Sequence, residues 1–166
     1  MKKIILILLF PIFTYSQSPD SLVGVWQDAE NVGSGYSNSF LFFKDGNYAF
    51  FTSQMDCSKR IKAYYGTWKI SGVEDAILLT TESKVIVEGG RMEKSDGSGS
   101  CGSDSVLIGG EEKTLKLNPK EELDYAISKV YTDETKGLAR KFIYIDAMKY
   151  WYLGDPVQMR IHFEGE

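Results

Sequence analysis

Apolar and polar residues alternate with a period of two along most of the chain beyond residue 20, and short groups of turn-forming residues separate the alternating segments. A strand with one buried and one exposed face gives this pattern, whereas a helix repeats its apolar residues every three or four positions. The chain therefore predicts an all-β, antiparallel fold. The expected strands cover residues 22–27, 39–44, 47–53, 62–70, 76–82, 84–89, 104–109, 113–117, 123–131, 139–145, 148–153 and 157–164.

The clearest turn signal is the Asp-Gly pair of 44-KDGN-47, which suits a two-residue hairpin loop of type I′. With this loop, Phe43 would face Tyr48 and Leu41 would face Phe50 on one side of the hairpin. The opposite side of the hairpin is also apolar. One side is therefore expected to fill the interior, while the other meets a loop, a helix or another molecule.

One segment, 118–131, fits two structures. As a helix, Asn118 would be its N-cap, and Leu123 and Ile127 would share its apolar face. As a strand, Leu123, Tyr125 and Ile127 would share a face instead. The flanking segments both have the strand pattern, which favours the strand without excluding the helix.

The N-terminus has the features of a secretory signal peptide, residues 1–16. Lys2 and Lys3 precede a short apolar run, residues 4–13, and small residues stand before a cleavage point after Ser16. The run is too short to span a bilayer as a stable helix. We therefore expect a single domain of residues 17–166, exported to the periplasm or secreted and not membrane-spanning.

Charge and cysteine content narrow the choice of partners. The chain has 19 Lys and Arg against 23 Asp and Glu, with no basic cluster, which disfavours nucleic acid as a partner.

Cys57 and Cys101 are the only cysteines, and in an oxidising compartment they would form one disulfide, with two free thiols as the alternative. Two cysteines and the distant His162 do not make a metal-ligand set. The loop 95–105 has acidic residues at calcium-loop spacing but lacks the carboxylate that closes such a site. No metal or cofactor is expected.

Gly24 and Trp26 stand two residues apart at the start of the first expected strand. A glycine has no Cβ, so another stretch of backbone can approach Gly24 closely. Trp26 points to the same side of the strand, where its ring can close one end of a rolled sheet.

Four segments in order, 22-LVGVW-26, 41-LFFKDGNYAFF-51, 66-GTWKISG-72 and 77-ILLTTES-83, resemble bacterial secreted lipocalin-like domains. The resemblance implies an up-and-down β-barrel of about eight to ten strands that holds a small hydrophobic ligand. It also implies an arginine over the tryptophan. Side chains two residues apart on a strand point to the same face. Arg140 would therefore share a face with Phe142 and Tyr144 and could point inward, whereas Arg160 would share a face with Gln158 and His162 and point outward.

Apolar side chains of the central strands are the candidates for lining a ligand cavity, although a filled aromatic core is the plainer interpretation of the same residues. The candidates are Leu41, Phe43, Tyr48, Phe50, Tyr64 and Trp68.

Two classes of non-catalytic function fit the sequence. The first is binding of a small ligand inside the sheet. The second is a protein-interaction or inhibitor module that acts through the exposed loop 92–104, or a homodimer formed through an aromatic strip on the first hairpin. We expect no catalytic residues, because His162 is the only histidine and no nucleophile motif accompanies it.

Overall fold

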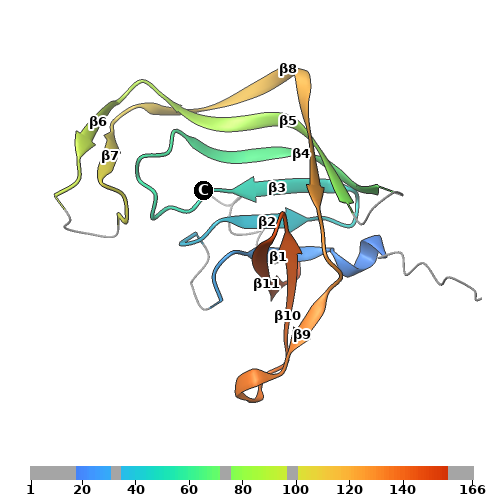
Figure 1. Ribbon diagram of the computed structural model, residues 1–166. Helices are drawn as coiled ribbons and strands as arrows, with labels where there is room; N and C mark the ends of the chain where they lie inside the picture. The colour runs from blue at the N-terminus through green and yellow to red at the C-terminus, as the bar shows by residue number, and fades with distance from the viewer. Residues whose placement is uncertain (1–17, 31–34, 72–75, 97–100, 157–166) are drawn as a thin grey trace, which may run out of the picture.

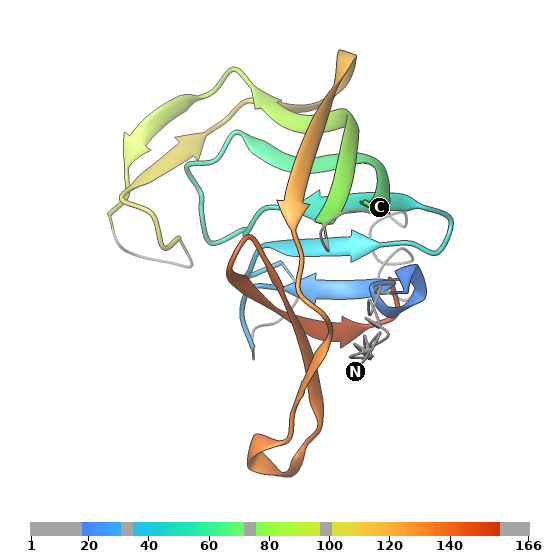
Figure 2. The same cartoon turned by 45° about the vertical axis from the view of Figure 1, so that its right-hand side comes forward.

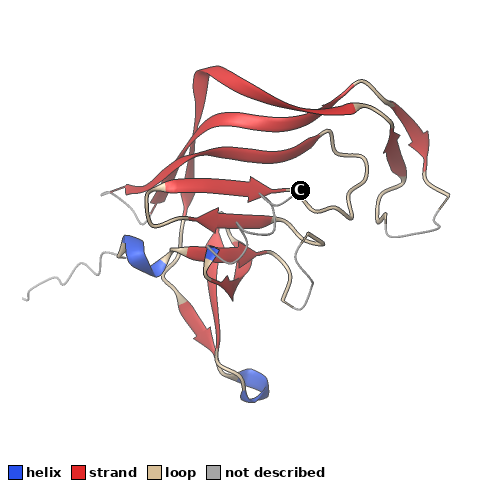
Figure 3. Cartoon of the chain, turned by 180° about the vertical axis from the view of Figure 1, so that it is seen from behind, coloured by secondary structure: helices blue, strands red, loops and turns tan. Residues whose placement is uncertain are grey.

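The computed structural model describes residues 18–30, 35–71, 76–96 and 101–156. Strands make up most of this chain (Figure 3), which confirms the all-β prediction. The expected signal peptide and the strand expected at 157–164 lie outside the described residues. The elements are η1 (Pro19–Ser21), β1 (Gly24–Gln27), β2 (Ser39–Phe42), β3 (Asn47–Phe51), β4 (Ile61–Ser71), β5 (Ala76–Glu88), β6 (Arg91–Lys94), β7 (Ser105–Ile108), β8 (Glu111–Ala126), β9 (Tyr131–Asp133), η2 (Thr135–Gly137), β10 (Arg140–Ile145) and β11 (Met148–Gly154).

Nine of these strands form one antiparallel sheet in the order β8-β5-β4-β3-β2-β1-β11-β10-β9 (Figure 1). The sheet curls, and β8 bends while it stays paired with β5, so that its end runs toward β10 (Figures 1 and 2). A single isolated bridge, Ile127 to Ile145, joins the two ends of the sheet. Among the described strands the sheet therefore does not close into a barrel.

Several expected strands differ in extent from the observed ones. β5 unites two of them in a single strand of 13 residues. β8 runs without a helix through residues 118–126, so the strand interpretation of that segment is confirmed up to Ala126. β6 was not expected, because three of its four residues fall in the loop predicted at 92–104; all four are exposed. The helical elements η1 and η2 are short 3-10 turns, and no helix among the described residues is long and apolar enough to cross a membrane.

The predicted register of the first hairpin is wrong by one residue. A type I′ loop needs positive φ at both central residues, and of the Asp45–Gly46 pair only Gly46 has it, at +82°. The Phe43 amide instead donates to the Asn47 carbonyl at 2.9 Å, which closes a loop of three residues.

This longer loop shifts every pair across the hairpin. Phe42 lies opposite Tyr48, and Phe40 lies opposite Phe50. Because neighbouring residues of a strand point to opposite faces, Leu41 comes to the other side of the sheet from Tyr48 and Phe50. Phe43 likewise packs against the cluster on that other side.

Each face of the sheet has its own apolar cluster. The inner face holds the main core, formed by Leu22, Trp26, Phe40, Phe42, Tyr48, Trp68, Ile77, Leu79, Ile127, Ile143, Ile145 and Tyr150. The outer face holds a smaller cluster of Val25, Leu41 and Ala49, with Phe43 and Phe51 packed against it. The inner cluster draws residues from seven of the nine strands, so it is the core that the curled sheet encloses.

Gly24 permits a close contact, as predicted, but mainly with a side chain. Its φ is +148°, and a Cβ built there would lie 2.2 Å from the ring of Tyr152 on β11. The same ring packs on Trp26 with centroids 5.1 Å apart. Trp26 is fully buried, and its Nε1 donates to the Leu22 carbonyl at 2.7 Å. The contact thus seats the indole where β1 meets β11.

The expectation that Arg140 covers Trp26 is wrong. Arg140 and Phe142 are two residues apart on β10, so their side chains point to the same face of the sheet, and Phe142 lies opposite Trp151 on β11. Trp26 pairs with Tyr152, the next residue of that strand, and so lies on the opposite face of the sheet. The Arg140 guanidinium instead pairs with Glu30 at 2.6 Å. The alternative, Arg160, lies outside the described residues.

β6 and β7 form a separate two-stranded arm beyond one end of β5 and β8 (Figure 1). The predicted disulfide between Cys57 and Cys101 is confirmed, with Cα atoms 5.6 Å apart. Beside it, the Leu107 amide donates to the Cys57 carbonyl at 2.9 Å. The disulfide therefore ties the connection between the arm strands to the loop between β3 and β4.

Replacing Gly24 with alanine should lower the free energy of unfolding by about 2–4 kcal/mol, because the added methyl overlaps the Tyr152 ring in a backbone conformation that disfavours L residues. The matched control is Gly154→Ala. Gly154 also has positive φ, +136°, but no atom lies within 4 Å of its built Cβ. Urea unfolding should show a clearly smaller loss for the control, and equal losses would contradict the role of the ring contact.

Removing the disulfide should also destabilise the fold. With a sequence separation of 44 between the two cysteines, the chain-entropy model gives a loss of about 4 kcal/mol. Urea unfolding with and without a reductant measures the loss. The double variant Cys57→Ser/Cys101→Ser should match the reduced protein and show no further response to reductant. An unchanged midpoint on reduction would show that the crosslink contributes nothing.

Candidate functional site

The inner face of the sheet holds a cavity of about 250 Å³. Five strands, β2, β3, β4, β5 and β8, supply its walls. Its lining residues are Phe40, Tyr48, Phe50, Tyr64, Leu79, Thr81, Glu121, Leu123 and Tyr125. Phe40, Leu79 and Thr81 are buried, whereas Leu123 is 41% exposed, so the cavity opens along β8.

Strand register aligns the aromatic rings of this cavity. Phe40 lies opposite Phe50, and Phe50 lies opposite Tyr64, which gives a row across β2, β3 and β4. The ring centroids are 4.5 Å apart for the first pair and 6.1 Å for the second. Tyr125 reaches Phe40 from β8, edge to face at 6.5 Å. The curl of the sheet therefore places rings on more than one side of the same space.

The polar groups of the cavity are few and lie at defined places. The hydroxyl of Tyr48 is hydrogen-bonded to Oγ1 of Thr81 at 2.5 Å, and both side chains are buried. At the open side, the Glu121 carboxylate lies 3.8 Å from the Lys84 ammonium. Within the described residues, the hydroxyls of Tyr64 and Tyr125 have no hydrogen-bond partner. They are thus available to a bound molecule.

The phenols in and beside the cavity resist ionisation. Burial raises the pKa of Tyr48, and nearby Glu121 raises it further, although the hydrogen bond from Thr81 opposes the shift. Burial is also the main cause of the raised pKa of Tyr64 and Tyr125. For Tyr150, which packs on Phe40, burial raises the pKa to about 12. The phenols therefore stay neutral at physiological pH and act as hydrogen-bonding groups.

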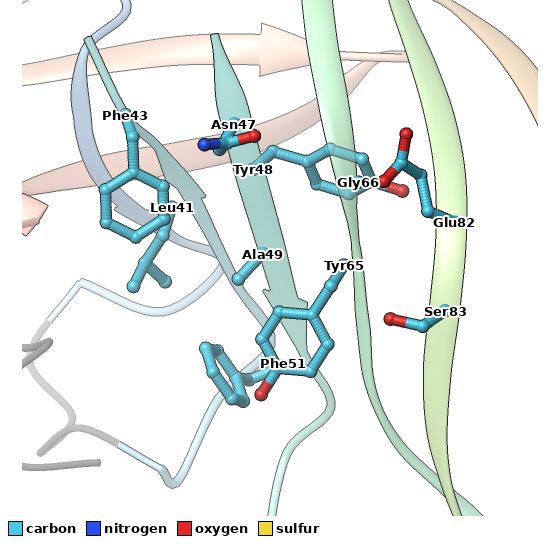
Figure 4. Close-up of a pocket in the computed structure, with 10 residues that line it drawn as sticks. All are labelled: Leu41, Phe43, Asn47, Tyr48, Ala49, Phe51, Tyr65, Gly66, Glu82 and Ser83. Atoms are coloured by element: carbon cyan, nitrogen blue, oxygen red, sulfur yellow. The ribbon is translucent and has the colours of Figure 1, made fainter. Parts of the chain in front are cut away.

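A second hollow, of about 350 Å³, lies on the outer face (Figure 4). Leu41 and Phe43 lie on one side of it, and Glu82 and Ser83 lie on the other. Two of its lining residues, Ala49 and Gly66, have little or no side chain, which leaves space between the larger side chains around them. Gly66 is required there, because a Cβ would lie 1.9 Å from the Thr80 carbonyl oxygen. The outer hollow is larger than the inner cavity but is less enclosed by aromatic rings.

The six residues predicted to line a ligand cavity do not lie together. Tyr48, Phe50 and Tyr64 line the inner cavity. Trp68 shares the inner face but belongs to the packed core, where its Nε1 donates to the Phe43 carbonyl at 3.1 Å. The remaining two, Leu41 and Phe43, line the outer hollow, because of the register shift in the hairpin.

Sequence reasoning did not identify the β8 contribution to the cavity, namely Glu121, Leu123 and Tyr125. Their spacing of two residues predicts that they share one face of a strand. It does not predict which distant strands that face lies against. Thr81 was also missed, because nothing in the strand pattern separates this threonine from the other polar residues of the same strand. In the described chain, no group of three or more His, Cys, Asp and Glu side chains is placed to hold a metal ion.

The raised pKa of Tyr150 predicts a loss of stability in alkali. The folded protein holds this proton up to about pH 12, whereas the unfolded chain releases it near pH 10, so stability falls as pH rises through that interval. Urea midpoints measured across it, with tyrosinate absorbance followed in parallel, should show the decline. The decline should be smaller in Tyr150→Phe than in the control Tyr36→Phe, whose side chain is 50% exposed. Equal declines in the two variants would rule out Tyr150 as its source.

The inner cavity thus joins apolar walls, neutral phenols and one carboxylate at its open side. No family model matches the chain, and no curated protein or solved structure is significantly similar to it. The cavity itself is therefore the main evidence for function.

Proposed function

We propose that this chain is an exported, non-catalytic binding protein that holds a small, largely hydrophobic ligand in the inner cavity. The observation that carries the proposal is the aromatic lining of that cavity, which has a volume of about 250 Å³. Small-molecule sites are typically concave and apolar, with a few well-placed polar groups. The hydroxyls of Tyr64 and Tyr125 and the Glu121 carboxylate supply those groups.

We further propose a lipocalin-like fold in which the sheet rolls toward a barrel. The continuous nine-stranded sheet, its buried Trp26 and the bridge between Ile127 and Ile145 support this proposal. Export is supported by the signal-like residues 1–16 and by the disulfide, a bond that persists mainly in oxidising compartments.

A specific observation also favours the second function, a protein-interaction module. The β6–β7 arm stands apart from the main sheet, is tied down near Cys101, and exposes two large apolar side chains. Met92 is 46% exposed and Ile108 is 41% exposed. A stiffened arm loses less conformational entropy when it binds a partner. This function requires no ligand in the cavity.

Native mass spectrometry of the protein purified from its own host tests the ligand proposal. We expect a discrete small molecule to accompany the protein, and we expect the emptied protein to take up a hydrophobic fluorescent dye. A protein that is reproducibly empty and takes up no dye would contradict the proposal and favour the interaction module.

The variant Leu123→Arg should weaken dye binding by about tenfold or more, because it places a charge at the open side of the cavity. The matched control is Leu115→Arg. Leu115 lies on the same strand with a similar exposure, 38%, but does not line the cavity. Fluorescence titration should show near-normal binding for the control. Equal losses in both variants would place the dye elsewhere on β8.

A further inference from the structure

The inner cavity places aromatic rings and one carboxylate, that of Glu121, around one space, and Lys84 lies beside Glu121 at the open side. From this arrangement, and on the basis of the proposed function, we infer the chemical class of the ligand. We propose that the ligand carries an ammonium group, which lies against the rings of Phe40, Phe50, Tyr64 and Tyr125 with the Glu121 carboxylate as its counter-charge.

The rings that line the cavity are tilted against one another rather than stacked. Among these rings, the centroid of Phe40 lies 4.5 Å from that of Phe50 and 6.5 Å from that of Tyr125, and the centroids of Phe50 and Tyr64 are 6.1 Å apart. Behind the lining, Phe40 also packs on Tyr150 at 5.3 Å and stacks on Phe42 at 5.6 Å. None of the three pairs within the cavity lining is parallel, since their interplanar angles are 50°, 67° and 49°. A ring carries negative charge density on its face, so rings set at such angles can attract one cation from several directions.

The charged groups that act on the cavity phenols are carboxylates. Burial is the main cause of the raised pKa of these phenols; Glu121 adds to it for Tyr48 and Tyr64, and Asp146 adds to it for Tyr125 and Tyr150. Asp28 adds to the effect on Tyr150. Glu121, the one carboxylate that lines the cavity, contributes a negative potential there, which favours a cation over an anion of the same shape.

Lys84 is the cation that faces Glu121, and the two charged atoms are 3.8 Å apart at the open side of the cavity. This distance is near the limit for an ion pair, and Glu121 is half exposed, so the pair is weak. A ligand ammonium inside the cavity can approach the same carboxylate while also contacting the rings. An anionic ligand could pair with Lys84 only by lying close to Glu121 and the ring faces, which repel it.

The free phenol hydroxyls fit the same ligand. Tyr64 and Tyr125 have no hydrogen-bond partner in the described chain, and a phenol oxygen can accept a hydrogen bond from an ammonium N–H. A primary ammonium would therefore use the oxygens and the rings, whereas a quaternary ammonium would use the rings alone.

Four probes with the same ten-carbon chain test the inference: decylammonium, decyltrimethylammonium, decanol and decanoate. Their affinities for the full disulfide-bonded protein can be measured by isothermal titration calorimetry below the micelle-forming concentration. We expect the two cations to bind about tenfold more tightly than decanol, and decanoate to bind most weakly.

The variant Glu121→Gln keeps the size of the side chain and removes its charge. It should weaken binding of both cations by about threefold to tenfold and leave decanol unchanged. The matched control is Glu122→Gln. Glu122 is the next residue of β8, points to the opposite face and lies outside the cavity lining. This control should bind all four probes as the unmodified protein does.

The outcomes separate this inference from the function on which it rests. If decanol or decanoate binds as tightly as the cations, or if Glu121→Gln leaves cation binding unchanged, the ammonium preference is overturned and hydrophobic binding stands. If none of the four probes binds, the proposed function fails together with the inference. Thermal unfolding of each variant checks that the fold is retained.

Discussion

The contact between Gly24 and Tyr152 joins the two parts of the sheet. Strands β1 to β5, with β8, form one part, and strands β9 to β11 form the other, so the β1–β11 ladder is their only extended connection in the described chain. The Tyr152 ring fills the space that any Cβ at position 24 would occupy, and it packs on the buried Trp26. A larger residue at position 24 would force these strands apart at the point where the inner core begins.

The inner cavity depends on that continuity. The row of rings that starts at Trp26 continues through Phe40 and Phe50 to Tyr64, one residue from each of four neighbouring strands. The curl of the sheet then brings Tyr125 of β8 back onto Phe40 and brings Ile127 to Ile145. The core and the cavity are therefore parts of one surface, filled at the β1 side and open at the β8 side.

This position explains how one apolar face can serve both stability and binding. At the filled side, side chains such as Trp26 and Ile143 are fully buried and contribute to the stability of the fold. At the open side, the lining includes Leu123 and the charged Glu121, which still reach water. A ligand entering there would cover surface that the protein leaves exposed, with little change to the packed core.

The sequence by itself determined the strands and the residues that share a face within each strand, because period-two alternation is a local property. It correctly placed Tyr48 with Phe50 and Tyr64 with Trp68, and it paired the two cysteines. It could not fix the register across the Asp45–Gly46 turn, because that depends on the φ angle of a single residue, and Leu41 and Phe43 were therefore placed on the wrong face. Only the tertiary structure decided that Glu121 and Tyr125 complete the cavity. Their position depends on the curl of the whole sheet, which arises from contacts between distant segments that no local pattern records.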